Sequence, residues 1–339
     1  MANILRNVVV KGAKSSTRTR TNYIQRDVIR PTKLMSTIST ADPKRVDPRE
    51  AYTVKLEYEG TDTSDVKDIV NELTLGPGHV KLSGLFSKDD VDNARDTIMY
   101  LAETQGSRAT HFQGKGKPET QARVWNLLNK GQIFEKIIQH PKILAILDPI
   151  LGDDCQLGSV AANVLFPGGS GQEPHIDYPY WDYFSKKHWP VPPKSPEIQF
   201  HMNIQVTVML HDFTKENGAT AVLPGSQKNI HYPDDADSFY ANCIQTEGKT
   251  GDVVMFPGLI NHCAMPNKSN KPRGALLMQY LPKYIRPMED QRRLLQKTVM
   301  QRATPQLRRL LAVDYPYPAI MDELDPINSE GANSDFDWK

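Results

Sequence analysis

The sequence is poor in cysteine and has no long apolar run. It holds three cysteines in 339 residues, Cys155, Cys243 and Cys263, and no two of them form a CxxC pair. An odd set of separated cysteines argues against a disulfide framework and against a thiolate zinc cluster. No segment approaches the roughly 20 apolar residues that a membrane-spanning helix needs. The sequence therefore predicts a protein of a reducing compartment with no integral membrane segment.

An excess of charge of one sign is also absent. The chain has 41 Lys and Arg against 40 Asp and Glu, a formal net charge of +1, which gives no global field that would attract nucleic acid. Hydrophobic residues make up 39% of the chain, enough for a sizeable core. We therefore expect a soluble globular protein whose partner is a small molecule and not a nucleic acid. Length alone leaves the number of domains open.

The N-terminal part of the chain divides into two segments. Residues 1–45 are basic and rich in Ser and Thr, and the first 40 residues contain eight Lys or Arg and a single acid. Such a composition is typical of a transit segment or of a basic tail that carries no targeting signal. We therefore expect a cytoplasmic protein or, if the segment is a transit peptide, a mitochondrial one. Residues 46–76 predict an N-terminal extension with a strand over 52–60 and a helix over 64–73.

Helices and strands are expected to separate within a main domain over 77–285. A short strand at 79–86 leads to Ser87, a candidate N-cap for the helix that follows. The stretch 131–152 predicts two further helices that are divided at Pro141. Helices therefore dominate the first half of this domain.

From about residue 155 to residue 285, short β-rich runs are separated by Gly, Pro and Asn turns. We expect a mainly β fold with flanking helices, whose core is a double-stranded β-helix, that is, a cupin-like jelly roll. The final segment, 286–339, predicts helices over 289–303 and 304–311, followed by an acidic tail.

The segment EPHIDYPYW holds the first candidate metal ligands. His175 and Asp177 are two residues apart on an expected strand, so both side chains should project from the same face. His262 follows the apolar run GDVVMF and a PG turn, and it is expected to supply a third ligand from a strand that is adjacent in the fold. Two histidines and one carboxylate on one side of a metal leave other positions open, an arrangement that favours iron(II).

Arg273 begins another expected strand, eleven residues after His262. A buried guanidinium is costly unless an anion meets it, and its planar fork suits bidentate recognition of a carboxylate. The carboxylate of a 2-oxo acid is a candidate partner. Taken alone, an HxD triplet is common in chains of this length, and the ordered set carries the prediction. His201 and His211, on an expected strand over 198–211, are interpreted as core or surface histidines.

The same segments resemble the phytanoyl-CoA dioxygenase family of iron(II)- and 2-oxoglutarate-dependent oxygenases. The similarity runs from about residue 78 to residue 282 and includes the segments GHVKLSGLFSKDDVDNAR, HPKILAILDPILGDDCQLGS and ENGATAVLPGSQK. This resemblance implies that His175, Asp177 and His262 bind iron and that Arg273 anchors 2-oxoglutarate. It also suggests 2-oxoglutarate contacts from residues with weaker support, namely Trp181, Asn163 and Thr207.

An aromatic stretch follows the first two candidate ligands. In a jelly-roll enzyme the loop after the first ligand strand often lies over the site, so its rings could line a substrate pocket and exclude water. Ordinary packing against the helices is the alternative. The residues predicted to line the pocket are Tyr178, Tyr180, Tyr183, Phe184 and Trp189.

Together these patterns predict an oxygenase that uses Fe(II), 2-oxoglutarate and O2. It would oxidise, most simply by hydroxylation, an unactivated C–H bond of a small organic metabolite and release succinate and CO2. Two alternatives stay open on the residues alone. One is a catalytically silent jelly-roll module that binds metal and 2-oxoglutarate, and the other is a cupin-type metal hydrolase or isomerase.

Overall fold

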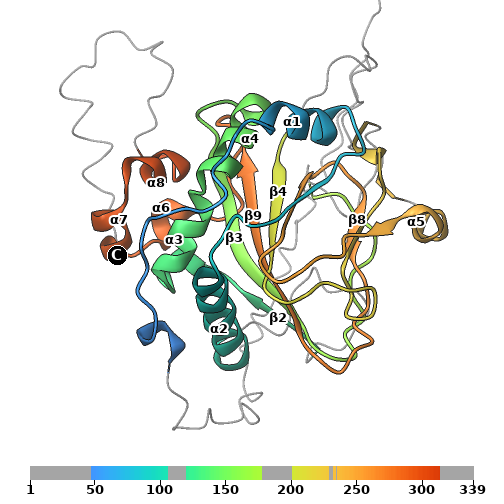
Figure 1. The fold of residues 1–339 in the computed structure, drawn as a ribbon, viewed down its shortest axis with the longest axis horizontal. Coiled ribbons are helices and arrows are strands. Elements are labelled where there is room, and N and C mark those ends of the chain that lie inside the picture. The colour runs from blue at the N-terminus through green and yellow to red at the C-terminus, as the bar shows by residue number, and fades with distance from the viewer. Residues whose placement is uncertain (1–46, 106–119, 178–200, 229–231, 234, 314–339) are drawn as a thin grey trace, which may run out of the picture. The chain divides into compact units, whose positions relative to one another are not determined.

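A computed structural model gives the arrangement of most of the chain (Figure 1). It describes residues 47–105, 120–177, 201–228, 232–233 and 235–313. All of these residues belong to one compact unit, Val46–Lys339. The predicted basic segment lies outside the described residues, as does the acidic tail from residue 314 onward.

A large antiparallel sheet of six strands forms the centre of this unit, in the order β1-β7-β4-β9-β3-β2. The longest strands, β3 and β9, pair along most of their length. The six strands are β1 (Val80–Leu82), β2 (Gln121–Val124), β3 (Gln156–Leu165), β4 (Ile204–Met209), β7 (Val253–Pro257) and β9 (Arg273–Leu281).

A small antiparallel sheet of three strands completes the β structure, in the order β6-β5-β8. Its strands are β5 (Thr220–Val222), β6 (Ile244–Gln245) and β8 (His262–Ala264). The chain passes from the large sheet to the small one between β7 and β8, and returns between β8 and β9. This arrangement confirms the predicted jelly-roll core.

Helices flank the large sheet. In Figure 1, α3, α4 and α6–α8 lie on one side of it, whereas β8 and α5 lie on the other. Among the described residues, no helix is long and apolar enough to cross a membrane. The helices are α1 (Val66–Thr74), α2 (Lys88–Thr104), α3 (Gln132–Ile138), α4 (Pro141–Leu151), α5 (Ala236–Asn242), α6 (Gln291–Leu294), α7 (Lys297–Arg302) and α8 (Pro305–Leu310).

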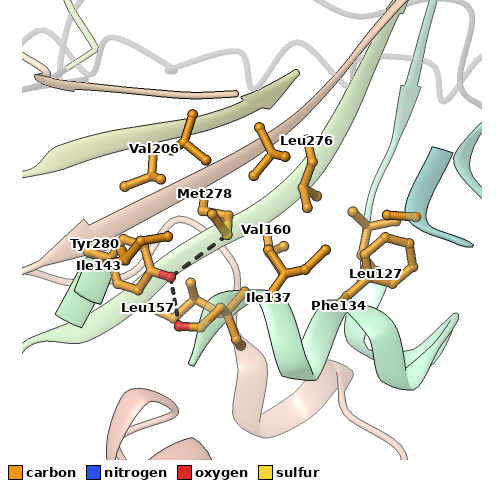
Figure 2. Packing of buried hydrophobic residues seen from close by; sticks show 14 of the residues in the cluster. Leu127, Phe134, Ile137, Ile143, Leu157, Val160, Val206, Leu276, Met278 and Tyr280 are labelled. Carbon is orange, nitrogen blue, oxygen red and sulfur yellow. Dashed lines mark hydrogen bonds between the residues drawn. The ribbon is translucent and has the colours of Figure 1, made fainter. Parts of the chain in front are cut away.

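The hydrophobic core lies between the large sheet and these helices (Figure 2). Alternate residues of each strand face it, among them Val160, Val206 and Met278, which are all fully buried. The Tyr280 hydroxyl donates a hydrogen bond of 2.8 Å to the carbonyl of Ile138 and so joins β9 to the end of α3. Because side chains alternate along a strand, the remaining residues of β3, β4 and β9 face the small sheet.

Several predicted elements are confirmed by the structure. Ser87 caps α2, since its hydroxyl accepts a hydrogen bond from the backbone N–H of Asp90. The two helices predicted over 131–152 are α3 and α4, which are separated before Pro141. All three cysteines are free, in agreement with the absence of a disulfide framework.

Other elements differ from the sequence prediction. Residues 52–60 form no strand, because Leu56 and Tyr58 lie against the helical layer at α4 and not beside a sheet edge. The strand predicted over 198–211 is described only as the shorter β4. The helix predicted over 289–303 is divided into α6 and α7, since Leu295 between them is extended and fully buried.

Candidate metal centre

Backbone hydrogen bonds bring together the three side chains that the sequence predicts as metal ligands. His175 and His262 form an isolated antiparallel bridge, in which each backbone N–H donates to the carbonyl of the other at 2.9 Å. The N–H of Asp177 donates to the carbonyl of Gly258 at 2.8 Å. His175 and Asp177 therefore lie on an extended segment with a single bridge and not on the regular strand that was expected. The segment still places both side chains beside His262.

The metal-binding atoms of the three side chains converge. The carboxylate oxygens of Asp177 lie 3.4 Å from Nε2 of His175 and 3.4 Å from Nε2 of His262, and one ligand atom from each residue lies within 4.8 Å of the others. Two atoms bound to the same ion at about 2.1 Å and a right angle would be about 3 Å apart. The spacing therefore suits a shared metal ion.

The orientation of both imidazoles is fixed by their other ring nitrogen. Nδ1 of His175 lies 2.8 Å from the carbonyl of Glu173, and Nδ1 of His262 lies 2.9 Å from the carbonyl of Ile260. A carbonyl only accepts, so each Nδ1 donates a proton to it, and Nε2 is the ring nitrogen that faces Asp177 and is left to bind a metal ion. Metal-binding histidines are commonly oriented in this way.

Charges within the cluster keep the Asp177 carboxyl ionised, which is the form that binds a metal ion. Burial alone would raise the pKa of the Asp177 carboxyl, but the imidazoles of His262 and His175 lower it below its ordinary value. Burial would likewise lower the pKa of His262, whereas the Asp177 carboxylate raises it. The three side chains are thus held together by charge as well as by the backbone.

Within the described residues, this is the cluster of His, Cys, Asp and Glu side chains that could hold a metal ion. His201 and His211 do not belong to it. Burial lowers the pKa of His201 to about 4, and Nδ1 of His211 accepts a hydrogen bond of 3.0 Å from the backbone N–H of Gly274. Burial raises the pKa of the Cys263 thiol to about 12, so this neighbour of His262 is an inert buried thiol.

Arg273 is a buried cation at the start of β9. Its side chain is 2% exposed, and its Cζ lies 4.8 Å from the ring centroid of Phe213. One terminal nitrogen donates a hydrogen bond of 2.5 Å to the carbonyl of Gly218, but Nε has no partner. Burial, and then the charge of Arg123, lowers the pKa of the guanidinium to about 10. No described carboxylate forms an ion pair with it, so the site lacks an anion that this side chain requires.

One cavity connects the cluster with Arg273. Its walls include His175, Asp177, His262 and Arg273. They also include Asn163 and Thr207, which the sequence predicted beside the co-substrate. The large sheet supplies one wall and the small sheet the other, so the candidate ligand atoms and the Arg273 guanidinium line the same space.

Sequence reasoning missed part of this cavity, because it did not identify β2. This strand pairs with β3 and brings Arg123 opposite Asn163. The Cζ of Arg123 lies 6.0 Å from the centre of the Trp125 ring, and both residues line the cavity. The signal was available in the sequence QARVW, where Gln121, Arg123 and Trp125 alternate with apolar residues.

The remaining predicted site residues lie outside the described residues. They are Trp181 and the predicted substrate-pocket residues Tyr178, Tyr180, Tyr183, Phe184 and Trp189. Their roles stay predictions.

Comparison with known proteins gives a consistent result. The family model for phytanoyl-CoA dioxygenase matches residues 76–275, which include the three candidate metal ligands and Arg273. The dioxygenase af480 of Aspergillus fumigatus is 24% identical over 301 residues, which cover 83% of this chain and 89% of the relative. The Fe(II)/2-oxoglutarate-dependent dioxygenase nvfF of Aspergillus novofumigatus is 26% identical over 255 residues, which cover 72% of this chain and 81% of the relative.

A solved structure shares the fold. The epimerase SnoN, in complex with Fe3+, alpha ketoglutarate and nogalamycin RO, superimposes with a TM-score of 0.52 at 16% sequence identity. The match covers 67% of this chain and 88% of SnoN. At this level of identity the likeness supports the jelly-roll architecture of the described unit.

Proposed function

The chain belongs to the phytanoyl-CoA dioxygenase family, and from this premise we propose that it is an iron(II)- and 2-oxoglutarate-dependent oxygenase that hydroxylates an unactivated C–H bond of a small organic metabolite. The reaction consumes O2 and 2-oxoglutarate and releases succinate and CO2. A relative is itself named as an Fe(II)/2-oxoglutarate-dependent dioxygenase. Neither the family name nor the name of this relative assigns roles to residues or states the reaction outcome, and both are proposed here for this chain.

The single observation that carries the proposal is the shared cavity, in which three converging candidate metal ligands lie with a buried guanidinium that forms no ion pair with a described carboxylate. In the proposal, His175 and His262 bind iron through Nε2, and Asp177 binds it through a carboxylate oxygen. Two imidazoles and one carboxylate on one side of iron(II) leave the opposite side open for other ligands. The donor set therefore fits this metal.

Arg273 fits the co-substrate equally well. A dicarboxylate could place its far carboxylate against the guanidinium, supply the partner that Nε lacks and offset the charge that burial makes costly. Asn163 and Thr207 would add polar contacts along the molecule. The oxygen of the Asn163 amide already accepts a hydrogen bond of 2.8 Å from Gln121, which leaves the amide nitrogen available as a donor.

When bound, iron and 2-oxoglutarate together supply the activation of O2, with one oxygen atom ending in succinate and the other in the hydroxylated product. The protein contributes position. The backbone bridge fixes His175 against His262, and Arg273 fixes the direction from which the dicarboxylate approaches. The apolar side chains of Phe256 and Leu277, which line the same cavity, limit the access of water.

Arg273 also weighs against a cupin-type hydrolase or isomerase. An enzyme that works with the metal alone has no use for a dicarboxylate anchor, and the curated relatives of this chain are named as dioxygenases. The retained anchor therefore favours a reaction that consumes 2-oxoglutarate.

The direct test is succinate release from 2-oxoglutarate under air with added iron(II). We expect turnover by the wild-type protein, and a loss of at least about a thousandfold in Asp177→Ala and His175→Ala, because each variant removes an iron ligand. Asp237→Ala, which removes a carboxylate in the first turn of α5, is the matched control and should keep wild-type activity. Absence of iron binding and of succinate formation with a broad substrate panel would contradict the proposal.

A further inference from the structure

We propose that Ser226 is a positioning residue of the candidate metal centre. Its hydroxyl holds the imidazole of His262 in the orientation that binds metal, and it does so through the peptide group that joins Ile260 to Asn261. Ser226 touches neither the metal ligands nor the cavity, and it acts through the backbone alone. This inference rests on the proposed function, since it concerns a ligand of the same metal.

A tight turn after β5 presents the Ser226 hydroxyl. The backbone N–H of Ser226 donates to the carbonyl of Leu223 at 3.2 Å. Pro224 and Gly225 occupy the two central positions of the turn, and Gly225 has a φ of +81°. Proline followed by a glycine with positive φ is typical of a type II turn. The sequence LPGS therefore places the hydroxyl at the end of a rigid turn.

The hydroxyl joins this turn to the residue that precedes His262. It donates to the carbonyl of Leu223 at 2.7 Å, and it accepts a hydrogen bond of 2.9 Å from the backbone N–H of Asn261. The N–H of Leu223 donates in turn to the carbonyl of Asn261 at 2.8 Å. Because the hydroxyl proton is used at Leu223, the oxygen faces Asn261 as an acceptor. The turn thus holds both backbone polar groups of Asn261.

The N–H of Asn261 and the carbonyl of Ile260 belong to one peptide group. This group is planar, so a hydrogen bond to its N–H fixes the direction of its carbonyl. The carbonyl accepts from Nδ1 of His262 at 2.9 Å, while Nε2 of the same ring lies 3.4 Å from the carboxylate of Asp177. Both Ile260 and Asn261 are buried. Loss of the Ser226 hydroxyl would therefore free the peptide plane to turn, and the ring that offers Nε2 would turn with it.

The second imidazole is oriented without such a hydroxyl. Nδ1 of His175 lies 2.8 Å from the carbonyl of Glu173, again two residues earlier in the chain. The peptide group that carries this carbonyl joins Glu173 to Pro174, and a proline nitrogen has no N–H to be held. The pyrrolidine ring itself restricts the backbone there. Both histidines use the same kind of hydrogen bond, but that of His262 depends on a side chain that mutation can remove.

The turn between β7 and β8 supports Asp177 independently of Ser226. The carbonyl of Gly258 accepts from the N–H of Asp177 at 2.8 Å, and the N–H of Gly258 donates to the carbonyl of Asn203 at 3.3 Å. These contacts involve backbone atoms that a change at Ser226 leaves in place. Removal of the hydroxyl should therefore loosen one ligand of the three and weaken metal binding without abolishing it.

The test measures the binding of cobalt(II), a spectroscopic substitute for iron(II), to the full-length protein. The visible absorption band of bound cobalt(II) reports the geometry of its ligands. Ser226→Ala removes the acceptor for the N–H of Asn261, so the apparent Kd for cobalt(II) should rise roughly tenfold and the band should shift. Ser226→Thr keeps a hydroxyl and should restore the wild-type affinity and band.

Thr304→Ala separates this role from a purely structural one. The Thr304 hydroxyl also accepts from a backbone N–H, that of Leu307 at 3.0 Å, and donates to the side-chain oxygen of Gln139, but it lies at the start of α8. Its loss should lower the Tm and leave the cobalt(II) affinity and band unchanged. Wild-type affinity together with a wild-type band in Ser226→Ala would overturn the inference, whatever the Tm of that variant.

A second variant keeps the test decisive if Ser226→Ala does not fold. Gly225→Ala retains the hydroxyl but strains the turn that presents it, because a side chain is disfavoured at a φ of +81° although the surrounding space is open. It should weaken cobalt(II) binding by less than Ser226→Ala. Gly84→Ala imposes the same kind of strain at a φ of +71°, in open space between β1 and α2, and should bind cobalt(II) as the wild type does. Equal affinities of these two glycine variants would contradict the role of Ser226.

Failure of the proposed function gives a different result. If the wild-type protein binds no cobalt(II), or if His262→Gln binds it with the wild-type affinity and band, the metal centre itself is wrongly assigned. If the wild type binds cobalt(II) and His262→Gln does not, while Ser226→Ala matches the wild type, the metal centre stands and the role of Ser226 is wrong.

Discussion

The two sides of the cavity hold their functional groups in different ways. On the small-sheet side, the candidate ligands are joined by backbone hydrogen bonds, His175 to His262 and Asp177 to Gly258. On the large-sheet side, the guanidinium of Arg273 is buried, and its Nε has no partner. The ligand side is therefore organised by geometry, with charges that favour one another. The anchor side carries an electrostatic cost that only a bound anion offsets.

This difference has a consequence for mutations. Removal of a ligand should abolish function and leave the large sheet intact, whereas removal of the anchor should weaken co-substrate binding and relieve the fold of a buried charge. On neither side, therefore, should a loss of activity be accompanied by a loss of stability.

The largest effect is expected on the ligand side. His262→Gln keeps the backbone bridge to His175 but removes the Nε2 ligand, so the iron content of the purified protein and its succinate formation should fall by at least about a thousandfold. Isothermal titration should show that 2-oxoglutarate still binds weakly through Arg273. Retention of stoichiometric iron in this variant, measured by elemental analysis, would show that the metal lies elsewhere.

The anchor should respond differently. Arg273→Met keeps the length of the side chain and removes its charge, and we expect the KM for 2-oxoglutarate to rise by about a hundredfold, since a buried charge pair is lost. In the absence of 2-oxoglutarate the variant should unfold at a higher temperature than the wild type, because its free energy of unfolding should be larger by about 1–3 kcal/mol. The contrast fails if Arg273→Met lowers the Tm and leaves the KM unchanged.

A surface arginine supplies the control for this prediction. Arg309 lies 3.4 Å from the carboxylate of Asp148 and is partly exposed. Such pairs contribute little to stability, so Arg309→Met should change neither the KM for 2-oxoglutarate nor the Tm by a comparable amount. Added 2-oxoglutarate should raise the Tm of the wild type and of this control, but not that of Arg273→Met.

The same contrast explains what the sequence could predict. The convergence of His175, Asp177 and His262 could be predicted because their residue types and order are those of a candidate metal site. Arg273 could be predicted as a candidate anchor because a buried cation at the start of an apolar strand needs an anion. The jelly roll followed from the change of periodicity near residue 155. These are properties of local pattern, which a single sequence contains.

Properties that depend on tertiary pairing could not be predicted in the same way. The strand expected over 52–60 has the right alternation, but α4 lies beside it and supplies no sheet edge. Arg123 was missed because β2 is a strand only through its pairing with β3.

An intermediate effect is expected at the backbone that supports Asp177. A Cβ on Gly258 would lie 2.1 Å from the Asn203 amide oxygen, and Asn203 is 1% exposed and cannot move away freely. Gly258→Ala should therefore displace the carbonyl that holds Asp177 and weaken iron binding about tenfold. Gly131→Ala is the control, because its Cβ would make an ordinary contact of 3.4 Å with Phe134. Equal iron affinity in the two variants would show that the backbone does not organise the ligand side.

The smallest effect tests whether the edge of the large sheet carries a second buried charge. Glu289 is 7% exposed, and burial raises the pKa of its carboxyl to about 7 from an ordinary 4.5, while its N–H remains bound to Gly158. The folded state thus holds a proton that the unfolded state loses at lower pH. The contribution of this carboxyl to the free energy of unfolding is fully present below about pH 4.5, falls as the pH rises toward 7, and is lost above that pH.

Glu289→Gln resembles the protonated acid at every pH. It should match the Tm of the wild type near pH 5 and exceed it by a few degrees at pH 8, since a shift of this size corresponds to about 3 kcal/mol at most. Glu72→Gln, which alters an exposed carboxylate on α1, should change the Tm equally at both pH values. A Tm difference for Glu289→Gln that does not grow with pH would mean that burial of the Glu289 carboxyl does not add to the electrostatic cost of the large-sheet side. In that case the electrostatic cost lies with the buried cations of the large-sheet side, because burial at the edge of the sheet would have left a carboxylate unaffected.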